Sequence, residues 1–507
     1  MKVLNFLILF SVMAISRAFA QEAVWGQSLD SEYGGVTIEN VATPTGEVLL
    51  FGYYNGELAV GNQVLVPKYN NSGSYLIKLA NDSSVISFFP VDGQSVVIEN
   101  ANIDSKGDIV IAGRFWESIE FDGQEYVDQS ESTSFKSSFI AKYSQDGTAH
   151  WLKIFPNSGY TTLTVDENDD IYVLSHEMMD YYSTSSHLRK FSPNGALVFD
   201  NKFLLESEAR SYPRCIDVRN GEVLVGGTVD GNGTIFDSLT FTGGGAGFYL
   251  ALFKSDGSTK WAKKIGETNY NNADISDVMF DDDGSFYIAG GLSDNMLFAR
   301  YDTQGSLQWS KKSLPQSFAS GYVSKGIDGS IFLATNFYDK AEIDGQVLSA
   351  TPDSHMVLNA PNVALIKFNE AGNILGIQQF QPYIVNLVTS ISVSPFDEVF
   401  ISGFSDAPAI KVGTVNITSP NDNWENAGDG YVIKFDGTSL GAPGFEILAD
   451  EDCINESIAF NTTFYASEIK NIIWDFGDPV SGSQNSSIQK KTNAHGYYFE
   501  RTWHILA

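Results

Sequence analysis

The chain has 507 residues, with 62 acidic and 31 basic side chains and a formal net charge of -31. Such a surface repels phosphate backbones and anionic lipid, which argues against nucleic acid and membrane surfaces as partners. Many short β-rich runs are separated by Asp-Gly and Asn-Gly turns. This pattern predicts an all-β protein.

Residues 1–20 have the features of a secretory signal peptide. Lys2 precedes an apolar stretch over residues 4–15, and residues 18–20 read Ala-Phe-Ala, a small-residue cleavage pattern. The stretch is too short for a comfortable membrane span. We expect export, a mature chain beginning at Gln21 with no later membrane span, and an extracellular or cell-surface location.

A unit of four short strands organises most of the chain. Its clearest copy is Val278–Lys312. An acidic turn at Asp281–Gly284 follows the first strand, the second strand ends at Gly290, and Trp309 marks the fourth strand. Self-similar units on this scale indicate a repeat architecture.

The second strand of the unit occurs seven times, each copy ending in a small residue. The copies end at Gly52, Gly113, Ser175, Gly227, Gly290, Thr335 and Gly403. Their mean spacing of about 58 residues is on the scale of a four-stranded propeller blade. Small residues there suit a close backbone approach between neighbouring sheets. The repeat predicts a seven-bladed β-propeller over residues 21–440.

Six third strands carry a basic residue at one equivalent position. These residues are Lys78, Lys142, Lys190, Arg300, Lys367 and Lys434, while the fourth copy has Leu252. They could form a ring for an anion, or each could extend its stem over the blade to a local carboxylate. We favour the second interpretation because a third strand lies away from the central channel.

A large side chain leads the fourth strand in several copies, as at Trp151, Phe199, Trp261 and Trp309. The seventh copy lacks this strand, and a matching segment with Trp25 occurs near the N-terminus. A ring whose last blade takes its outer strand from the N-terminus closes without open edges. We therefore expect an N-terminal strand to close the propeller.

The units at Asp104–Trp151 and Asp281–Trp309 resemble the SBBP-type β-propeller repeats of exported bacterial proteins. That resemblance covers most of the chain and implies a fold but no activity. Residues 474–478 read WDFGD, which resembles the signature of PKD domains, immunoglobulin-like β-sandwiches of surface proteins. It implies an incomplete PKD-like domain over residues 445–507. The tail departs from that family, and we expect it to be out of frame, with the natural domain continuing.

Signatures of catalysis are lacking. The acidic turns, such as Asp281–Gly284, could hold calcium through their oxygens, but Asp, Asn and Gly are also ordinary turn formers, and no full calcium-binding loop occurs. We therefore expect no cofactor, with calcium as the open alternative. The six histidines form no metal-binding pair, and no G-x-S-x-G sequence occurs. Cys215 and Cys453 lie in different predicted domains, so we expect two buried thiols without a disulfide.

Long connections between second and third strands are the best candidates for ligand binding. They are Tyr126–Ser137, Ser349–Asn362 and Ile417–Gly430. The last contains Asn423, Trp424 and Glu425, an aromatic platform with polar neighbours of the kind that carbohydrate or peptide sites use. We expect Trp424, Glu425, Asn423 and Tyr126 to contact the ligand.

These features predict an exported surface or secreted protein that binds a glycan or protein without catalysis. The alternative is a polysaccharide-active enzyme, or an accessory module of a longer catalytic chain. A quinoprotein dehydrogenase is disfavoured because it typically has eight blades, and a structural spacer is a further possibility. The sequence does not indicate an oligomeric state.

Overall fold

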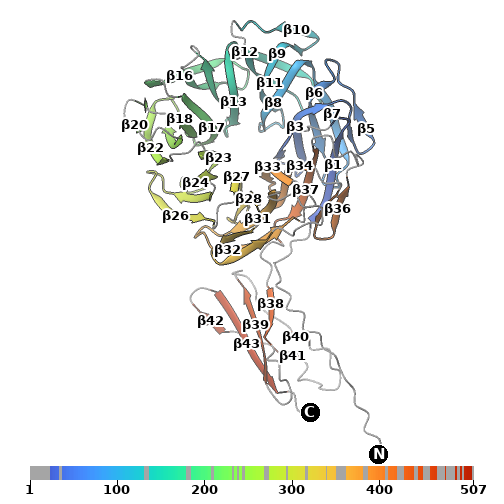
Figure 1. Ribbon diagram of the computed structural model, residues 1–507, viewed down its shortest axis with the longest axis vertical. Helices are drawn as coiled ribbons and strands as arrows, with labels where there is room; N and C mark the ends of the chain where they lie inside the picture. Colours follow the sequence, from blue (N-terminus) through green and yellow to red (C-terminus); the bar gives the residue numbers. More distant parts are fainter. Residues whose placement is uncertain are drawn as a thin grey trace, which may run out of the picture.

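Seven antiparallel sheets stand around a common axis in the computed structural model of the chain (Figure 1). The described residues contain strands and turns and no helix. The structure describes residues 23–33, 37–130, 136–178, 184–206, 210–230, 233–236, 239–241, 246–267, 273–292, 295–313, 318–338, 340–349, 361–380, 386–405, 409–418, 428–438, 444–448, 457–464, 474–475, 486–487, 491–493 and 496–504.

Each blade has four strands, numbered from the axis outward. The inner strands are β2 (Thr37–Ala42), β8 (Gly93–Ile103), β13 (Ser158–Val165), β17 (Arg210–Arg219), β23 (Ala273–Phe280), β27 (Phe318–Lys325) and β33 (Asn386–Val393). The second strands are β3 (Val48–Asn55), β9 (Ile109–Phe121), β14 (Ile171–Met178), β18 (Glu222–Asp230), β24 (Phe286–Leu292), β28 (Ile331–Tyr338) and β34 (Glu398–Ser405). The third strands are β6 (Ser72–Leu79), β11 (Ser137–Tyr143), β15 (Thr184–Phe191), β21 (Ala246–Phe253), β25 (Asn295–Tyr301), β31 (Pro361–Phe368) and β37 (Asp429–Asp436). The outer strands are β7 (Val85–Val91), β12 (Ala149–Phe155), β16 (Leu197–Glu206), β22 (Thr259–Glu267), β26 (Leu307–Lys312), β32 (Ile374–Gln379) and β1 (Ala23–Ser31).

Blades one to seven follow the order of their inner strands, and the seventh includes β1. Strand β1 pairs antiparallel with β37, and Trp25 lies opposite Lys434. Leu29 is fully buried. The indole Nε1 of Trp25 donates to the carbonyl oxygen of Asn81 in the first blade at 2.8 Å. This strand therefore connects the seventh blade to the first.

Hydrophobic side chains fill the space between adjacent blades. One cluster combines Leu49 and Phe51 of the first blade with Ile111 and Phe139 of the second. Both faces of a blade are covered by its neighbours, so inner positions of a strand are apolar on either face. The third strands β11 and β31 are accordingly buried at every residue.

One end of the ring carries the turns inside each blade, exemplified in the second blade by Asp104–Asp108 and Ser144–Thr148. We call it the turn end. The large residue of an outer strand packs there on a turn glycine of the next blade: a Cβ at Gly195 would lie 2.9 Å from the Trp151 ring, and one at Gly372 equally close to the ring of Trp309. Both glycines have a positive φ, which disfavours other residues. The contact between the turn glycine of one blade and the tryptophan of the preceding blade thus connects the two blades.

Short hairpins occupy several connections between second and third strands. They are β4 (Leu58–Val60) with β5 (Gln63–Leu65), β19 (Gly233–Ile235) with β20 (Leu239–Phe241), β29 (Lys340–Ile343) with β30 (Gln346–Ser349), and β35 (Ala409–Val412) with β36 (Val415–Thr418). In the second blade, β10 (Gln124–Val127) pairs with the end of β9. The sequence predicts loops at Tyr126 and Ile417, but both residues lie in strands. The reason is that the segments around them pair with a flanking segment.

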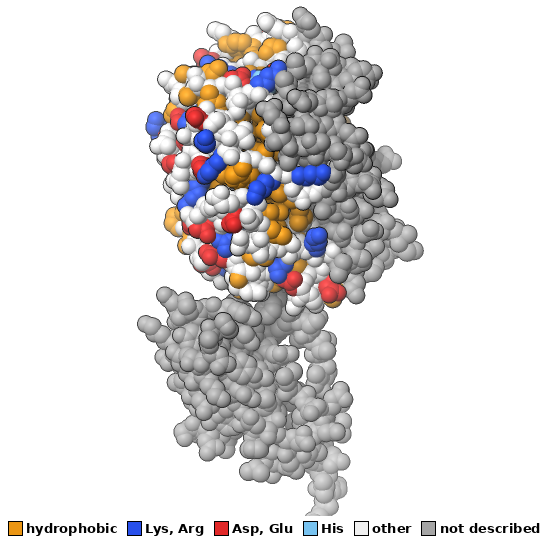
Figure 2. Space-filling view, turned by 90° about the vertical axis from the view of Figure 1, so that its left-hand side faces the viewer, with side chains coloured by type: hydrophobic (Ala, Val, Ile, Leu, Met, Phe, Trp, Pro, Cys, Tyr) orange, Lys and Arg blue, Asp and Glu red, His pale blue; other side chains and the backbone are white. Residues whose placement is uncertain are grey.

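Lysine side chains lie along the exposed outer strands of blades four and five. Figure 2 looks onto the side of the ring where β22 and β26 lie, and basic side chains are spread over it among hydrophobic ones. Lys260 and Lys263 belong to β22, and Lys311 to β26. Lysine on an edge strand opposes pairing with another chain. These lysines oppose edge-to-edge association even though Leu307, on the same exposed edge, is 54% exposed.

The strands after the propeller form two further sheets. Strands β38 (Gly444–Leu448), β39 (Ser457–Phe464), β43 (Gly496–His504) and β42 (Lys491–Asn493) lie in that order in one sheet. Strand β40 (Trp474–Asp475) pairs with β41 (Ser486–Ser487). Cys453 lies outside the described residues, as does the rest of the WDFGD segment. In the part of the chain that the structure describes, no helix has the length and apolar character needed to cross a membrane.

Candidate functional site

The basic residues of the third strands have a structural role. Each of the six contacts a carboxylate of its own blade, as Lys142 does with Asp104 at 2.6 Å and Lys367 with Asp328 at 3.1 Å. The other four pairs are Lys78–Glu47, Lys190–Asp170, Arg300–Asp281 and Lys434–Glu398. The prediction of local ion pairs is confirmed, and Leu252 is buried in the blade that lacks the pair.

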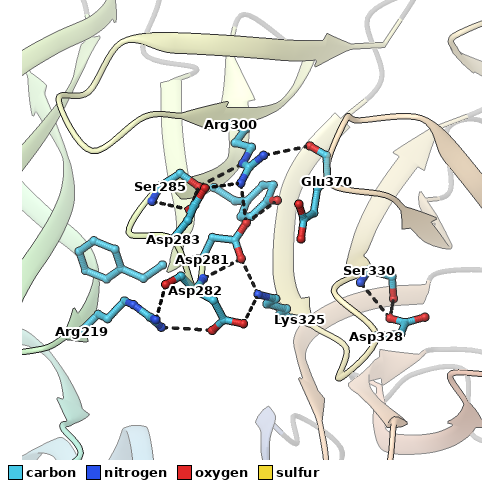
Figure 3. Close-up of polar contacts among 12 residues, drawn as sticks. Arg219, Asp281, Asp282, Asp283, Ser285, Arg300, Lys325, Asp328, Ser330 and Glu370 are labelled. Carbon is cyan, nitrogen blue, oxygen red and sulfur yellow. Dashed lines mark hydrogen bonds and ion pairs between the residues drawn. The ribbon is translucent and has the colours of Figure 1, made fainter.

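The acidic turn of the fifth blade is surrounded by cations (Figure 3). Asp281 contacts Arg300 at 2.8 Å and also Lys325, which comes from the sixth blade. Asp282 contacts Lys325 at 2.7 Å and Arg219 of the fourth blade at 3.3 Å. Burial tends to raise the pKa of Asp281, but the hydrogen bond from Lys325 lowers it below its ordinary value. This turn therefore connects three blades through its own ion pairs.

A metal site was the other interpretation of such turns. Among the described residues, no group of three or more His, Cys, Asp or Glu side chains is arranged to hold a metal ion. The buried thiol of Cys215 points at the carbonyl oxygen of Ile275 in the next blade.

The opposite end of the ring carries the starts of the inner strands and the connections between blades. We call it the connector end. Six inner strands contain a β-bulge there, in which one extra residue interrupts pairing with the second strand. Bulges redirect side chains and occur often beside active sites. The bulged residues are Glu99, Tyr160, Arg214, Ser276, Ser320 and Thr389.

Each bulge lies beside the small residue that ends a predicted second strand. A Cβ on Gly113 would lie 2.2 Å from the Val97 carbonyl oxygen, and one on Gly403 would lie 1.9 Å from that of Leu387. Only glycine fits so close to a neighbouring backbone. We predicted this close approach between neighbouring sheets, but the approaching backbone is that of the bulged inner strand in the same blade.

The bulge residues divide the ring into two halves. Blades two, three and four place Glu99, Tyr160 and Arg214 there, whereas blades five, six and seven place Ser276, Ser320 and Thr389. The inner strand of the first blade pairs without a bulge. In blades three and six the register shift leaves two residues unpaired, Gly159 with Tyr160 and Ala319 with Ser320. Large ionisable side chains thus occur at the bulges of blades two to four, and small hydroxyl side chains at those of blades five to seven.

Glu99 is held in place by two neighbours. Its carboxylate contacts Arg114 Nε at 2.6 Å, and it accepts a hydrogen bond from the Thr161 backbone N–H of the next blade at 3.0 Å. Burial raises the pKa of Glu99 to about 7, although Arg114 opposes the shift. The Arg114 guanidinium lies over the Trp116 ring at 5.3 Å.

His176 lies opposite the bulge of the third blade. Its ring meets Tyr212 edge to face at 5.8 Å, and the Arg214 guanidinium lies over the same tyrosine at 5.7 Å. A Cβ at Gly159 would come within 2.3 Å of His176 Nε2, so a side chain there would displace the imidazole. Burial, followed by the charges of Arg214 and Arg114, lowers the pKa of His176 to about 4. The imidazole is therefore neutral at pH 7.

Tyr160 extends toward the axis of the ring. Burial and charges from several blades, those of Glu39, Glu99 and Cys215 among them, raise the pKa of its hydroxyl well above the ordinary value. Burial also raises the pKa of Glu39 to about 8, and Glu99 and Asp277 add to this shift. Glu39 keeps partial exposure, so water reaches the surroundings of its carboxyl group.

Two other acids near the axis join blades together. Asp217 accepts a hydrogen bond from the Phe280 backbone N–H at 2.7 Å, and Asp277 accepts one from that of Val323 at 2.9 Å. In each case the donor belongs to the inner strand of the next blade. Burial raises the pKa of Asp217 to about 6 and that of Asp277 to about 7. Glu99 makes the same kind of contact with the Thr161 backbone N–H of the next blade, and it also contacts Arg114.

Three of the four residues expected to contact the ligand, Asn423, Trp424 and Glu425, lie outside the described residues. Tyr126 is 37% exposed on β10, and its hydroxyl donates to Gln124 at 3.2 Å. A shallow cavity of about 460 Å³ lies beside this strand and is lined by its neighbours Glu125 and Val127. Because side chains alternate along a strand, Tyr126 points to the opposite face.

The connector-end cluster of Glu99, Arg114, Tyr160, His176, Tyr212 and Arg214 was not found from the sequence. Its residues are spread over three repeats, and none belongs to a short motif. The repeat contains a signal that could have found this cluster. When the first strands of the blades are aligned, the bulge position changes from Ser or Thr in some blades to ionisable residues in others. That alignment requires the positions of the bulges, which insert one residue into each strand.

No family model matches the sequence, and no curated protein matches it. Matches to solved structures have low sequence identity and TM-scores below 0.5. A protein of unknown function from Dyadobacter fermentans is 10% identical with a TM-score of 0.41, over 82% of this chain and 99% of that one. A PL25 ulvan lyase bound to -[GlcA(1-4)Rha3S]- is 11% identical with a TM-score of 0.41, over 81% and 96%. An α-L-arabinanase from Penicillium chrysogenum, complexed with arabinobiose, is 7% identical with a TM-score of 0.32, over 72% and 88%.

Proposed function

We propose that the protein is an exported binding protein without catalytic activity, secreted or held at the cell surface, which takes a glycan or protein ligand at the connector end. The observation that carries this proposal is the break in the repeat on blades two to four. Contacts that stabilise the ring recur in most blades, as the ion pairs of the third-strand cations do. The ring instead carries Glu99, Tyr160 and Arg214 together on one half. Such an uneven distribution is what a site for one asymmetric ligand needs.

Export is part of the same proposal. Residues 1–20 have the charge, apolar stretch and cleavage pattern of a secretory leader. The WDFGD segment supports a PKD-like module after the propeller, as surface proteins carry. Determining the N-terminal sequence of the exported chain tests this point, with Gln21 as the expected first residue. A retained Met1 on exported protein would contradict the proposed leader.

The segment with Asn423, Trp424 and Glu425 supplies further proposed contacts. It connects β36 to β37, and connections between second and third strands lie at the connector end. Tyr126 is a more distant contact on β10. We expect these residues to touch the outer parts of a long ligand, while the cluster near the axis holds one defined group.

Binding of the full chain to immobilised extracellular polysaccharides and surface proteins tests the function. Tyr212→Ala should weaken binding of the ligand found, because it removes the ring that supports Arg214 and His176. Lys106→Ala is the matched control, since Lys106 is exposed in a turn at the other end of the ring. Absence of any bound glycan or protein, together with turnover of a polysaccharide, would overturn the proposal.

A polysaccharide-active enzyme is the second candidate, and one observation favours it. His176, on the second strand of the third blade, lies opposite the bulge that contains Tyr160, and histidine and tyrosine are residue types that transfer protons in enzymes. Chain cleavage is followed by measuring new chain ends after incubation with polysaccharides. Loss of cleavage in His176→Ala with retained binding would assign catalysis to this site.

A further inference from the structure

Resting on the proposed binding function, we propose that Arg214 and Arg114 form a receptor for the carboxylate or sulfate groups of an acidic polysaccharide. Both residues belong to the connector-end cluster on blades two to four. The inference adds a ligand class to the site and names the two side chains that would select it.

Arg214 is positioned by its bulge. It is the extra residue between Pro213 and Cys215, which both pair with the second strand β18. The side chain is exposed, and its guanidinium lies over the Tyr212 ring at 5.7 Å. The planar fork of N–H groups of an exposed arginine matches a carboxylate or sulfate group in a bidentate geometry, and arginine also stacks on aromatic faces.

Arg114 repeats this arrangement on the neighbouring blade. Its guanidinium lies over the Trp116 ring at 5.3 Å, and its side chain is 36% exposed. Glu99 contacts it at Nε, which is the nitrogen nearest the main chain. Among the described residues, no other carboxylate forms an ion pair with Arg114. In the proposed receptor, the anionic ligand binds Arg114 through its terminal nitrogens.

His176 lies near both Arg114 and Arg214, the two halves of the proposed receptor. Its neutral ring contributes a hydrogen-bond donor or acceptor without adding charge. The contact with Tyr212 and the absence of a side chain at Gly159 fix the place of the imidazole. Three nitrogen-bearing side chains from blades two, three and four thus come together in a protein whose net charge is -31.

The surroundings favour a polysaccharide over a protein ligand. All six bulged residues around the axis carry a hydroxyl, carboxyl or guanidinium group. The centre of a protein–protein interface is depleted in charged groups and enriched in apolar contact. A sugar chain instead presents many hydroxyl groups and little continuous apolar area, which suits a polar surface such as the one that Arg114 and Arg214 form.

The test measures binding of the full chain to polygalacturonate, to its methyl-esterified form and to dextran sulfate. Esterification removes the charge and leaves the same backbone. Wild-type protein should bind a charged polymer at least about tenfold more tightly than the ester, because a charge-assisted hydrogen bond contributes about 1.5–3 kcal/mol and 1.4 kcal/mol is tenfold. Carboxylate and sulfate preference are separated by comparing polygalacturonate with dextran sulfate.

Arg214→Gln should reduce the affinity for the charged polymer at least about tenfold. Arg114→Gln should also reduce this affinity. Arg219→Gln is the matched control, because Arg219 lies on the same strand at the turn end, against Asp282. Equal binding of charged and esterified polymer, or equal losses in Arg214→Gln and Arg219→Gln, would overturn the receptor while leaving a binding function intact. Arg214-dependent binding of polyglutamate, with no binding of either acidic polysaccharide, would overturn the polysaccharide assignment.

Discussion

At the turn end of the ring the same contacts occur in blade after blade, whereas at the connector end equivalent positions carry different chemistry. Indole N–H groups of Trp25, Trp151 and Trp309 donate to the carbonyl oxygens of Asn81, Pro193 and Glu370 in the next blade. The bulges at the other end range from Arg214 to Ser276. Contacts that join neighbouring blades recur in several of them, and a binding site has no such requirement. Repetition therefore marks stability, and its absence marks the candidate site.

The largest effect is expected from the outer strand of the seventh blade. Deleting residues 23–31 removes the partner of β37 and exposes the face of the blade that Leu29 covers. We expect loss of the cooperative thermal transition followed by circular dichroism. Trp25→Ala should lower the free energy of unfolding by about 3 kcal/mol. Val24→Ala, at an exposed residue of the same strand, should change it by less than about 0.5 kcal/mol.

The buried ion pairs of the turn end come next. Lys142 and Asp104 are 6% and 1% exposed, so Lys142→Ala leaves a buried carboxylate without its cation. We expect a loss of about 3 kcal/mol in urea unfolding. Lys260→Ala breaks the pair with Glu222, which are 35% and 40% exposed, and should cost less than about 1 kcal/mol. Equal losses in the two variants would show that burial of the pair is unimportant.

The acids near the axis make stability depend on pH. The pKa of Glu39 is raised to about 8 in the folded protein, above its ordinary value of 4.5, so the folded state binds the proton more tightly. Its contribution to stability is complete below pH 4.5 and is lost as the pH rises through about 8. Glu39→Gln should therefore stabilise the protein at pH 8 by on the order of 2 kcal/mol, with little effect at pH 4.

Urea unfolding of wild type and Glu39→Gln at the two pH values measures this difference. Glu57→Gln is the control, because Glu57 is exposed and should leave the pH dependence unchanged. A Glu39→Gln variant that loses stability equally at both pH values would indicate that the carboxylate makes a contact needed for folding.

The smallest effect is expected at Tyr126. Tyr126→Ala removes an exposed ring on β10 and should change the free energy of unfolding by less than about 0.5 kcal/mol. Binding of an acidic polysaccharide should weaken by about threefold or less, as for loss of one peripheral aromatic contact. A loss equal to that of Arg214→Gln would move the centre of the site from the axis to the second blade.

The seven-bladed propeller, its four-strand unit and the pairing of third-strand cations with local carboxylates were all predictable from the sequence. These features depend on spacing within one repeat, and local rules of turn formation and alternation set them. The aligned Lys142 and Lys367 show this, because each meets a carboxylate in its own blade.

The cluster near the axis depended on tertiary structure. Glu99, His176 and Arg214 are far apart in the sequence and meet only because the ring brings three neighbouring blades together. Glu99 and Arg214 also owe their direction to a bulge, a one-residue shift of pairing that leaves no distinct composition in a short segment. Local contacts therefore defined the fold, and long-range closure of the ring decided which side chains share the candidate site.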